Sequence, residues 1–102
     1  MSSSQSQPAN APTSAPQNPG IMMYTTSWCS DCRRAKRIFA ARSIPYTEVD
    51  IEDDATAAEL VTRLNAGKRS VPTILFPDGT KLVEPSNAVL EAKLVPFARE
   101  SR

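Results

Sequence analysis

The chain alternates between short apolar segments and amphipathic ones, and its first half predicts a strand, a helix and a second strand. Residues 21–26 are largely apolar, which is typical of a short buried strand. Residues 31–42 carry apolar side chains at helical spacing and basic side chains elsewhere, so they predict an amphipathic helix that ends before Pro45. Residues 46–51 alternate between two faces, as the residues of a strand do.

The second half begins with a helix whose expected cap is an aspartate, Asp53 or Asp54, and which stops at Gly67. Its expected buried stripe consists of Ala57, Leu60, Val61 and Leu64. Residues 71–76 predict a third strand, and the Pro-Asp-Gly-Thr turn after it is typical of a hairpin. Residues 81–83 would then return antiparallel as a fourth, short strand.

A last helix is predicted after Pro85, with Ser86 or Asn87 as its cap. Pro96 is expected to end or kink it, because proline lacks an N–H group. Its expected apolar side chains are Val89, Leu90, Leu94 and Phe97. The first three elements form a right-handed βαβ unit, and the hairpin adds an antiparallel pair. The fold class is therefore α/β, with a four-stranded mixed sheet and three flanking helices in the order βαβαββα.

Composition separates the start of this 102-residue chain from the remainder. Residues 2–20 contain no large aliphatic or aromatic side chain, so they cannot bury enough apolar surface to offset the entropy of ordering. We interpret residues 1–20 as a flexible tail and residues 21–102 as one small domain. The tail lacks the basic start and apolar run of a signal peptide, and no later run could span a bilayer. We expect a cytoplasmic protein without membrane contact.

The only two cysteines, Cys29 and Cys32, lie where the first strand passes into the first helix. Residues at i and i+3 face the same side of a helix, so the two sulfurs can approach disulfide distance. A helix that begins near Cys29 would point free N–H groups and its positive dipole end at that sulfur, which favours the thiolate. Ligands of open α/β sheets bind at such strand ends. The pair predicts an attacking thiol and a resolving one.

Other interpretations of the cysteines are weaker or remain open. The pair could be incidental buried thiols. A zinc site is not expected, because two thiolates supply half of the usual ligands and the chain has no histidine.

A basic cluster follows the cysteine pair, and an acidic segment follows that cluster. Either both are solvated faces, or the basic cluster steers anionic thiols or a partner toward Cys29. Nucleic acid is excluded as a partner, because the formal net charge is only +1 and no aromatic residues interleave with the basic ones. The cluster is Arg33, Arg34, Lys36, Arg37 and Arg42.

A CxxC pair that opens a helix in such a chain resembles the glutaredoxin branch of the thioredoxin superfamily, most of all the mycoredoxins of actinobacteria. Residues 24–29, Tyr-Thr-Thr-Ser-Trp-Cys, are similar to the mycoredoxin active-site segment. Ser70-Val71-Pro72 takes the place of a Thr-Val-Pro segment, and the 77–79 turn and the 82–85 stretch follow in order. The resemblance implies a thioredoxin-like fold and a cis Val71–Pro72 bond. The backbone groups of Val71 would then be free to pair with an extended substrate.

The chain also departs from glutathione-dependent glutaredoxins. Ser30 and Asp31 replace Pro-Tyr between the cysteines, and residues 84–87, Glu-Pro-Ser-Asn, replace a Gly-Gly and an acidic residue. Mycothiol, or direct docking to a reductase or protein substrate, therefore becomes more plausible than glutathione. Asp31 would oppose thiolate formation; it either relays a proton to the leaving thiol or has a capping or solvated role.

The resemblance implies a thiol–disulfide oxidoreductase that reduces mixed disulfides between client proteins and a low-molecular-weight thiol, mycothiol or glutathione. Cys29 would be the nucleophile and Cys32 the resolver, with no tightly bound cofactor, no metal and a monomeric state. One alternative is an NrdH-type redoxin, reduced by the flavin enzyme thioredoxin reductase. Another is a module that bridges an iron–sulfur cluster between two subunits without turnover.

Six further residues are candidates for substrate binding. Trp28 is either a packing residue or an exposed platform beside the sulfur, and Tyr24 is either a core residue or a substrate contact. Lys68 and Arg69 form either a positive rim for a carboxylate or partner, or an ordinary solvated loop. Val71 and Pro72 would hold the substrate backbone beside Cys29.

Overall fold

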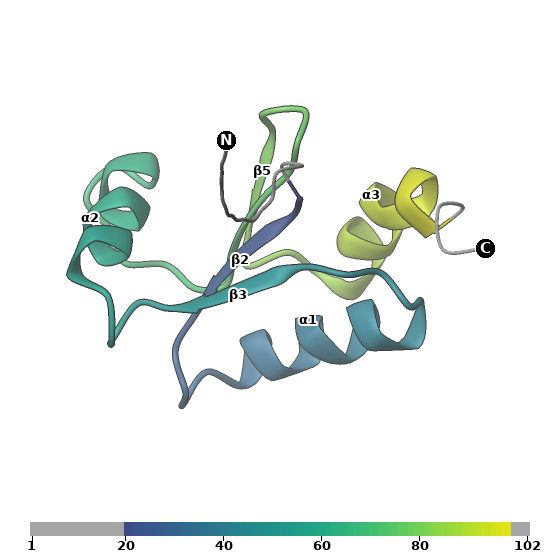
Figure 1. Ribbon diagram of the computed structural model, residues 1–102, viewed down its shortest axis with the longest axis horizontal. Coiled ribbons are helices and arrows are strands. Elements are labelled where there is room, and N and C mark those ends of the chain that lie inside the picture. Colours follow the sequence, from purple (N-terminus) through teal and green to yellow (C-terminus); the bar gives the residue numbers. More distant parts are fainter. Residues whose placement is uncertain (1–19, 99–102) are drawn as a thin grey trace, which may run out of the picture.

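The computed structural model describes residues 20–98, so the predicted tail lies outside the described residues apart from Gly20. Figure 1 shows three helices around a small sheet. The elements are β2 (Met22–Thr25), α1 (Ser30–Ala41), β3 (Thr47–Asp50), α2 (Ala55–Leu64), β4 (Thr73–Leu75), β5 (Lys81–Val83) and α3 (Asn87–Ala98). This is the predicted βαβαββα order, and the prediction of fold class is confirmed. Within residues 20–98, no helix has the length and apolar character needed to cross a bilayer.

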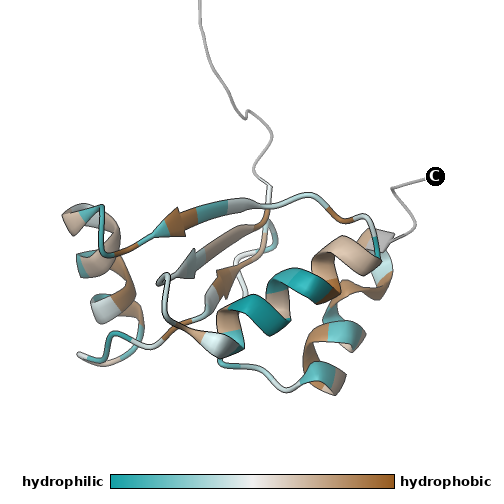
Figure 2. Cartoon of the chain, turned by 90° about the horizontal axis from the view of Figure 1, so that it is seen from below, coloured by the Kyte–Doolittle hydropathy of each residue, from teal (hydrophilic) through white to brown (hydrophobic). Residues whose placement is uncertain are grey.

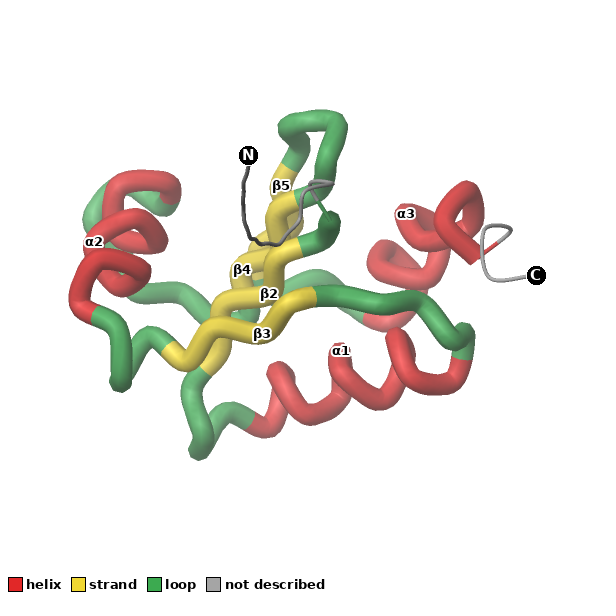
Figure 3. Tube along the Cα trace, viewed as in Figure 1, coloured by secondary structure: helices red, strands yellow, loops and turns green. Residues whose placement is uncertain are grey.

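The four strands form one mixed sheet in the order β3-β2-β4-β5 (Figure 3). β2 pairs with β3 in parallel and with β4 antiparallel, and β4 pairs antiparallel with β5. The register places Tyr24 opposite Thr73. The segment that leaves β2 toward the cysteines therefore runs beside Val71 and Pro72, which precede β4. Sheet topology thus brings together two segments that are about forty positions apart in the sequence.

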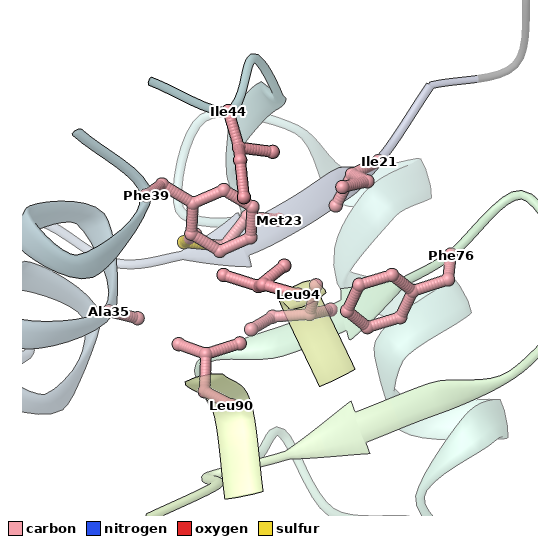
Figure 4. Close-up of a cluster of buried hydrophobic side chains, with 9 residues drawn as sticks. Ile21, Met23, Ala35, Phe39, Ile44, Phe76, Leu90 and Leu94 are labelled. Carbon is pink, nitrogen blue, oxygen red and sulfur yellow. The ribbon is translucent and has the colours of Figure 1, made fainter. Parts of the chain in front are cut away.

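Two hydrophobic clusters cover the two faces of the sheet, because neighbouring strand residues point to opposite sides. Met23 of β2 and Ile74 of β4 belong to the cluster under α1 and α3, which Figure 4 shows. Tyr24 belongs to the cluster under α2, which also contains both cysteines. Figure 2 shows that α1 combines strongly hydrophilic and hydrophobic residues, as expected of an amphipathic helix. The first cluster consists of Ile21, Met23, Ala35, Phe39, Ile44, Ile74, Phe76, Leu90 and Leu94.

The helix caps decide between alternatives that the sequence left open. Asp54 caps α2, because its Oδ1 accepts the Ala57 N–H at 3.0 Å. Ser86 precedes α3, and its hydroxyl accepts the Val89 N–H at 3.2 Å. α2 ends at Leu64 with Asn65 as its C-cap, before the predicted stop at Gly67. Ala66 and Gly67 follow with φ values of +57° and +92°, in the left-handed region that favours glycine.

Several details differ from the predicted elements. On α2, Ala58 is buried together with Ala57 and Val61, whereas Leu60 and Leu64 are only partly buried. α3 continues past Pro96 to Ala98, so this proline does not end the helix, although its missing N–H removes one helical bond. Val89 is 49% exposed, because it lies about 100° around the helix from the buried Leu90. The third strand begins at Thr73 and not at residue 71, since proline cannot donate to the sheet.

Candidate active site

Cys29 is the N-cap residue of α1, in an extended backbone conformation. Its Sγ accepts the backbone N–H of Cys32 at 3.0 Å, as the side-chain oxygen of an ordinary cap would. The positive end of the α1 dipole therefore points at the Cys29 sulfur. The Cys29 thiol also lies 3.8 Å from the Val71 carbonyl oxygen, to which it donates. The sulfur is therefore held between the start of α1 and the loop before β4.

Cys32 lies one helical turn further on and is fully buried. Burial raises the pKa of its thiol to about 12, and a hydrogen bond with the Cys29 side chain acts in the same direction. Both cysteines are free thiols in this structure. Cys32 therefore keeps its proton at neutral pH.

An open groove of about 430 Å³ runs past Cys29 and does not include Cys32. One side of the groove is the start of α1. The other side is the loop before β4 together with Glu84, the residue after β5. The Val71–Pro72 peptide bond on that side is cis, as the resemblance implied. Among residues 20–98, the Val71 N–H donates to no backbone acceptor. The groove is lined by Trp28, Cys29, Ser30, Asp31, Arg69, Ser70, Val71 and Glu84.

The structure separates the six predicted substrate-binding residues into two sets. Trp28, Arg69 and Val71 line the groove beside Cys29. Tyr24, Lys68 and Pro72 do not line it. Tyr24 is buried in the cluster that contains the cysteines, and burial raises its pKa. Pro72 is buried and Lys68 is exposed.

Trp28 takes the exposed form of its two predicted alternatives. Its side chain is 68% exposed, and its indole Nε1 donates to Glu52 Oε2 at 2.7 Å. The Ser27 hydroxyl donates to the other oxygen of Glu52 at 3.4 Å. Glu52 therefore anchors the segment that leads into Cys29 and restrains an indole that few other contacts hold.

Glu84 lines the groove but was not among the predicted site residues. Its φ of +48° is unusual for a residue other than glycine, and its N–H donates to the Pro72 carbonyl at 2.9 Å. No basic side chain among residues 20–98 forms a salt bridge with its carboxylate. The signal that could have found it is the hairpin register: Thr73 pairs with Val83, so the next residue lies opposite Pro72.

Most of the basic cluster on α1 is paired with acidic side chains. Salt bridges join Arg34 to Asp31 at 2.7 Å, Lys36 to Glu48 at 2.8 Å and Arg42 to Glu91 at 3.4 Å. Asp31 is thus an ion-pair partner on the groove rim, and Cys29 itself is the cap. Within residues 20–98, no three potential metal-ligating side chains of His, Cys, Asp or Glu gather in one place.

Comparisons with known proteins agree with this geometry. The family model described as Glutaredoxin matches residues 21–81. One relative is Rv3198A of Mycobacterium tuberculosis, which carries a provisional glutaredoxin name. It is 49% identical over 78 residues, which cover 76% of this chain and 93% of that protein. Mycoredoxin 1 of Corynebacterium glutamicum is 33% identical over 78 residues, 76% of this chain and 96% of the relative. The crystal structure of a buckwheat glutaredoxin–glutathione complex superposes with a TM-score of 0.60 at 20% identity, covering 78% of this chain and 76% of that one, and shows the common fold.

Proposed function

The chain belongs to the glutaredoxin family and is a thiol–disulfide oxidoreductase with a CxxC pair, and from this premise we propose that it reduces mixed disulfides between proteins and mycothiol. The observation that carries the proposal is the unequal placement of the two sulfurs. Both cysteines are buried, but Cys29 borders the groove and accepts a helix N–H, whereas Cys32 lies outside the groove and its raised pKa keeps it protonated. Such a pair suits one attacking and one resolving thiol.

In the proposed reaction the Cys29 thiolate attacks the small-thiol sulfur of a protein mixed disulfide. A Cys29–S bond to the small thiol forms, the bond to the client protein breaks, and the client sulfur leaves as a thiolate and takes up a proton. A second small thiol can then reduce Cys29 and leave as a symmetrical disulfide. Alternatively, the Cys32 thiolate displaces the small thiol and forms the Cys29–Cys32 disulfide, which a reductase must later reduce.

The backbone of Val71 is suited to hold the small thiol beside Cys29. Its N–H has no backbone acceptor among residues 20–98, and its carbonyl is released when the Cys29 thiol loses its proton. An extended substrate could therefore pair with this residue as an added strand does. The exposed indole of Trp28 and the guanidinium of Arg69 would contact the remainder of the ligand from two sides of the groove.

Mycothiol is preferred over glutathione for two reasons. The relative named mycoredoxin 1 matches 76% of this chain. In addition, Glu84 places a carboxylate without a salt-bridge partner on the groove rim, which would repel the carboxylates of glutathione and not an uncharged sugar-bearing thiol. Lys68, Tyr24 and Pro72 support the site from outside the groove in this proposal.

Purified oxidised protein, offered separate reducing systems based on mycothiol, glutathione and thioredoxin reductase, tests the proposal. We expect reduction by the mycothiol system. Reduction by thioredoxin reductase alone would favour the NrdH-type alternative, and a coloured protein after anaerobic purification would favour the cluster-binding one. The cysteine roles are tested separately: Cys29→Ser should abolish turnover, while Cys32→Ser should retain activity through the route that uses a second small thiol. Full activity of Cys29→Ser would contradict the assignment.

A further inference from the structure

The resolving step poses an electrostatic problem at Cys32. In that step the Cys32 thiol must lose its proton, yet its side chain is fully buried. Burial of this kind disfavours the charged form, and the side chain holds its proton to about pH 12. A favourable charge beside the sulfur would lower the barrier to resolution. The described residues supply one such charge.

That charge is on Lys36, four residues after Cys32 on α1. Residues at i and i+4 lie on the same face of a helix, with Cβ atoms about 6 Å apart. The Lys36 ammonium group donates to Glu48 Oε2 at 2.8 Å, and the Thr25 hydroxyl donates to the same oxygen at 2.8 Å. Thr25 is buried in β2. The chain of contacts from Thr25 through Glu48 to Lys36 therefore ties β2, β3 and α1 together beside Cys32.

Glu48 restrains the lysine through an ion pair in which both groups keep their charge. The hydrogen bond between them raises the pKa of Lys36 and lowers the pKa of Glu48, so both stay charged at neutral pH. Lys36 in turn lowers the pKa of Cys32, against the larger effect of burial. The other titratable groups near this sulfur are Cys29 from the loop before α1 and Tyr24 from β2; Tyr46 lies near Lys36. Among residues 20–98, Lys36 is the cation whose charge lowers the pKa of Cys32.

We propose that Lys36, held in place by Glu48 and Thr25, is a positioning residue for resolution that stabilises the Cys32 thiolate as it forms. The proposal rests on the proposed function and adds a residue to its second step. Cys32 gives its proton to solvent, and its sulfur attacks Cys29. The Cys29–Cys32 bond forms, the bond from Cys29 to the small thiol breaks, and that thiol leaves as a thiolate. Cys32 is oxidised and the small thiol is reduced.

The reaction of the reduced protein with an aromatic disulfide, Ellman's reagent, separates the two steps by stopped flow. Cys29 releases one coloured thiolate in a phase that depends on reagent concentration, and Cys32 releases the second in a phase that does not. Lys36→Gln should slow the second phase about three- to tenfold at neutral pH, the factor that corresponds to a rise of about 0.5 to 1 unit in the pKa of the attacking thiol. Its pH profile should move upward by about 0.5 to 1 unit. The first phase should change less than twofold.

Two variants show whether the effect belongs to the charge beside Cys32. Lys36→Arg keeps the charge and should restore the second phase to within about twofold of the wild type. Lys93→Gln also breaks a salt bridge, the 3.1 Å contact of Lys93 with Asp78, but on α3, and should leave both phases unchanged. A second phase of normal rate and pH profile in Lys36→Gln would overturn the inference while the proposed function stood. If the wild type itself released no coloured thiolate in either phase, the proposed function would be overturned instead.

Discussion

The buried thiol of Cys32 should make the reduced protein lose stability at alkaline pH. Its pKa is about 12 in the folded protein, against an ordinary value of 9.0. The folded state therefore holds this proton more tightly than the unfolded chain does. The resulting stabilisation is fully present below about pH 9 and is lost as the pH rises toward 12.

The size of the loss follows from this difference. At a pH of about 10.5, the unfolded thiol lies about 1.5 units above its pKa, while the folded thiol remains protonated. Each unit corresponds to about 1.4 kcal/mol, so the free energy of unfolding should fall by about 2 kcal/mol relative to neutral pH. The tyrosines Tyr24 and Tyr46, whose pKa values are also raised by burial, lower the stability over the same range. A matched variant must therefore isolate the share of Cys32.

Cys32→Ala provides that comparison, because it removes the titrating thiol and leaves both tyrosines. Urea unfolding of the reduced wild type and of the variant at neutral pH and at pH of about 10.5 gives the four free energies. The difference between the two proteins should shrink by about 2 kcal/mol at the higher pH. The oxidised wild type, which has no Cys32 thiol, should behave as the variant does. If the difference in the free energy of unfolding between the two proteins stayed constant within about 0.5 kcal/mol, the Cys32 thiol would not have a raised pKa in the folded protein. That result would also contradict the unequal roles proposed for the two cysteines.

Three further predictions concern the scaffold and the groove. Phe39 is fully buried and packs against neighbouring side chains of the first cluster, so Phe39→Ala should lower the free energy of unfolding by about 3–5 kcal/mol; a loss below about 1 kcal/mol in urea unfolding would contradict this packing. Asp54→Ala should cost about 1 kcal/mol through loss of the α2 cap, whereas Asp53→Ala should cost much less in the same assay. Glu52→Ala should free the Trp28 indole, and since this is the only tryptophan, its fluorescence should become more accessible to acrylamide; unchanged quenching would show that the 2.7 Å bond does not restrain it.

The arrangement of elements was predictable because burial in so small a domain follows local periodicity. Phe39 and Ala35 lie four residues apart on one face of α1, and both are buried in the first cluster. Val89 was predicted among the apolar side chains of the last helix but is exposed, because apolar character alone does not tell which side of a helix meets the sheet. The apolar pattern also predicted a third strand that begins at residue 71, whereas β4 begins at Thr73, because Pro72 cannot donate a sheet hydrogen bond.

The reactive centre was predictable for a similar reason: its main contacts are local in the sequence. The cap of Cys29 is the N–H of Cys32, three residues away. The supporting contacts were not predictable, because strand pairing creates them. Trp28 reaches Glu52 across 24 positions and Lys36 reaches Glu48 across 12, and both acids belong to a run that the sequence presented only as an acidic segment. Their partners depend on the register between β2 and β3.

The contacts to the Cys29 sulfur at the start of α1 are local in the sequence, whereas the contacts that would select a thiol arise from strand pairing. A cysteine at the N-cap of α1 has the free helix N–H groups and the positive end of the helix dipole beside its sulfur. In the proposed function, recognition of the small thiol depends on the groove rim, where Trp28, Arg69 and Glu84 come from three separate segments. Glu84 reaches the rim because the β4–β5 register places it opposite Pro72, and a slip of one residue would turn its side chain to the other face. Under the proposed function, thiol specificity therefore follows from strand pairing, and exchange of rim side chains should alter it while the Cys29 chemistry remains.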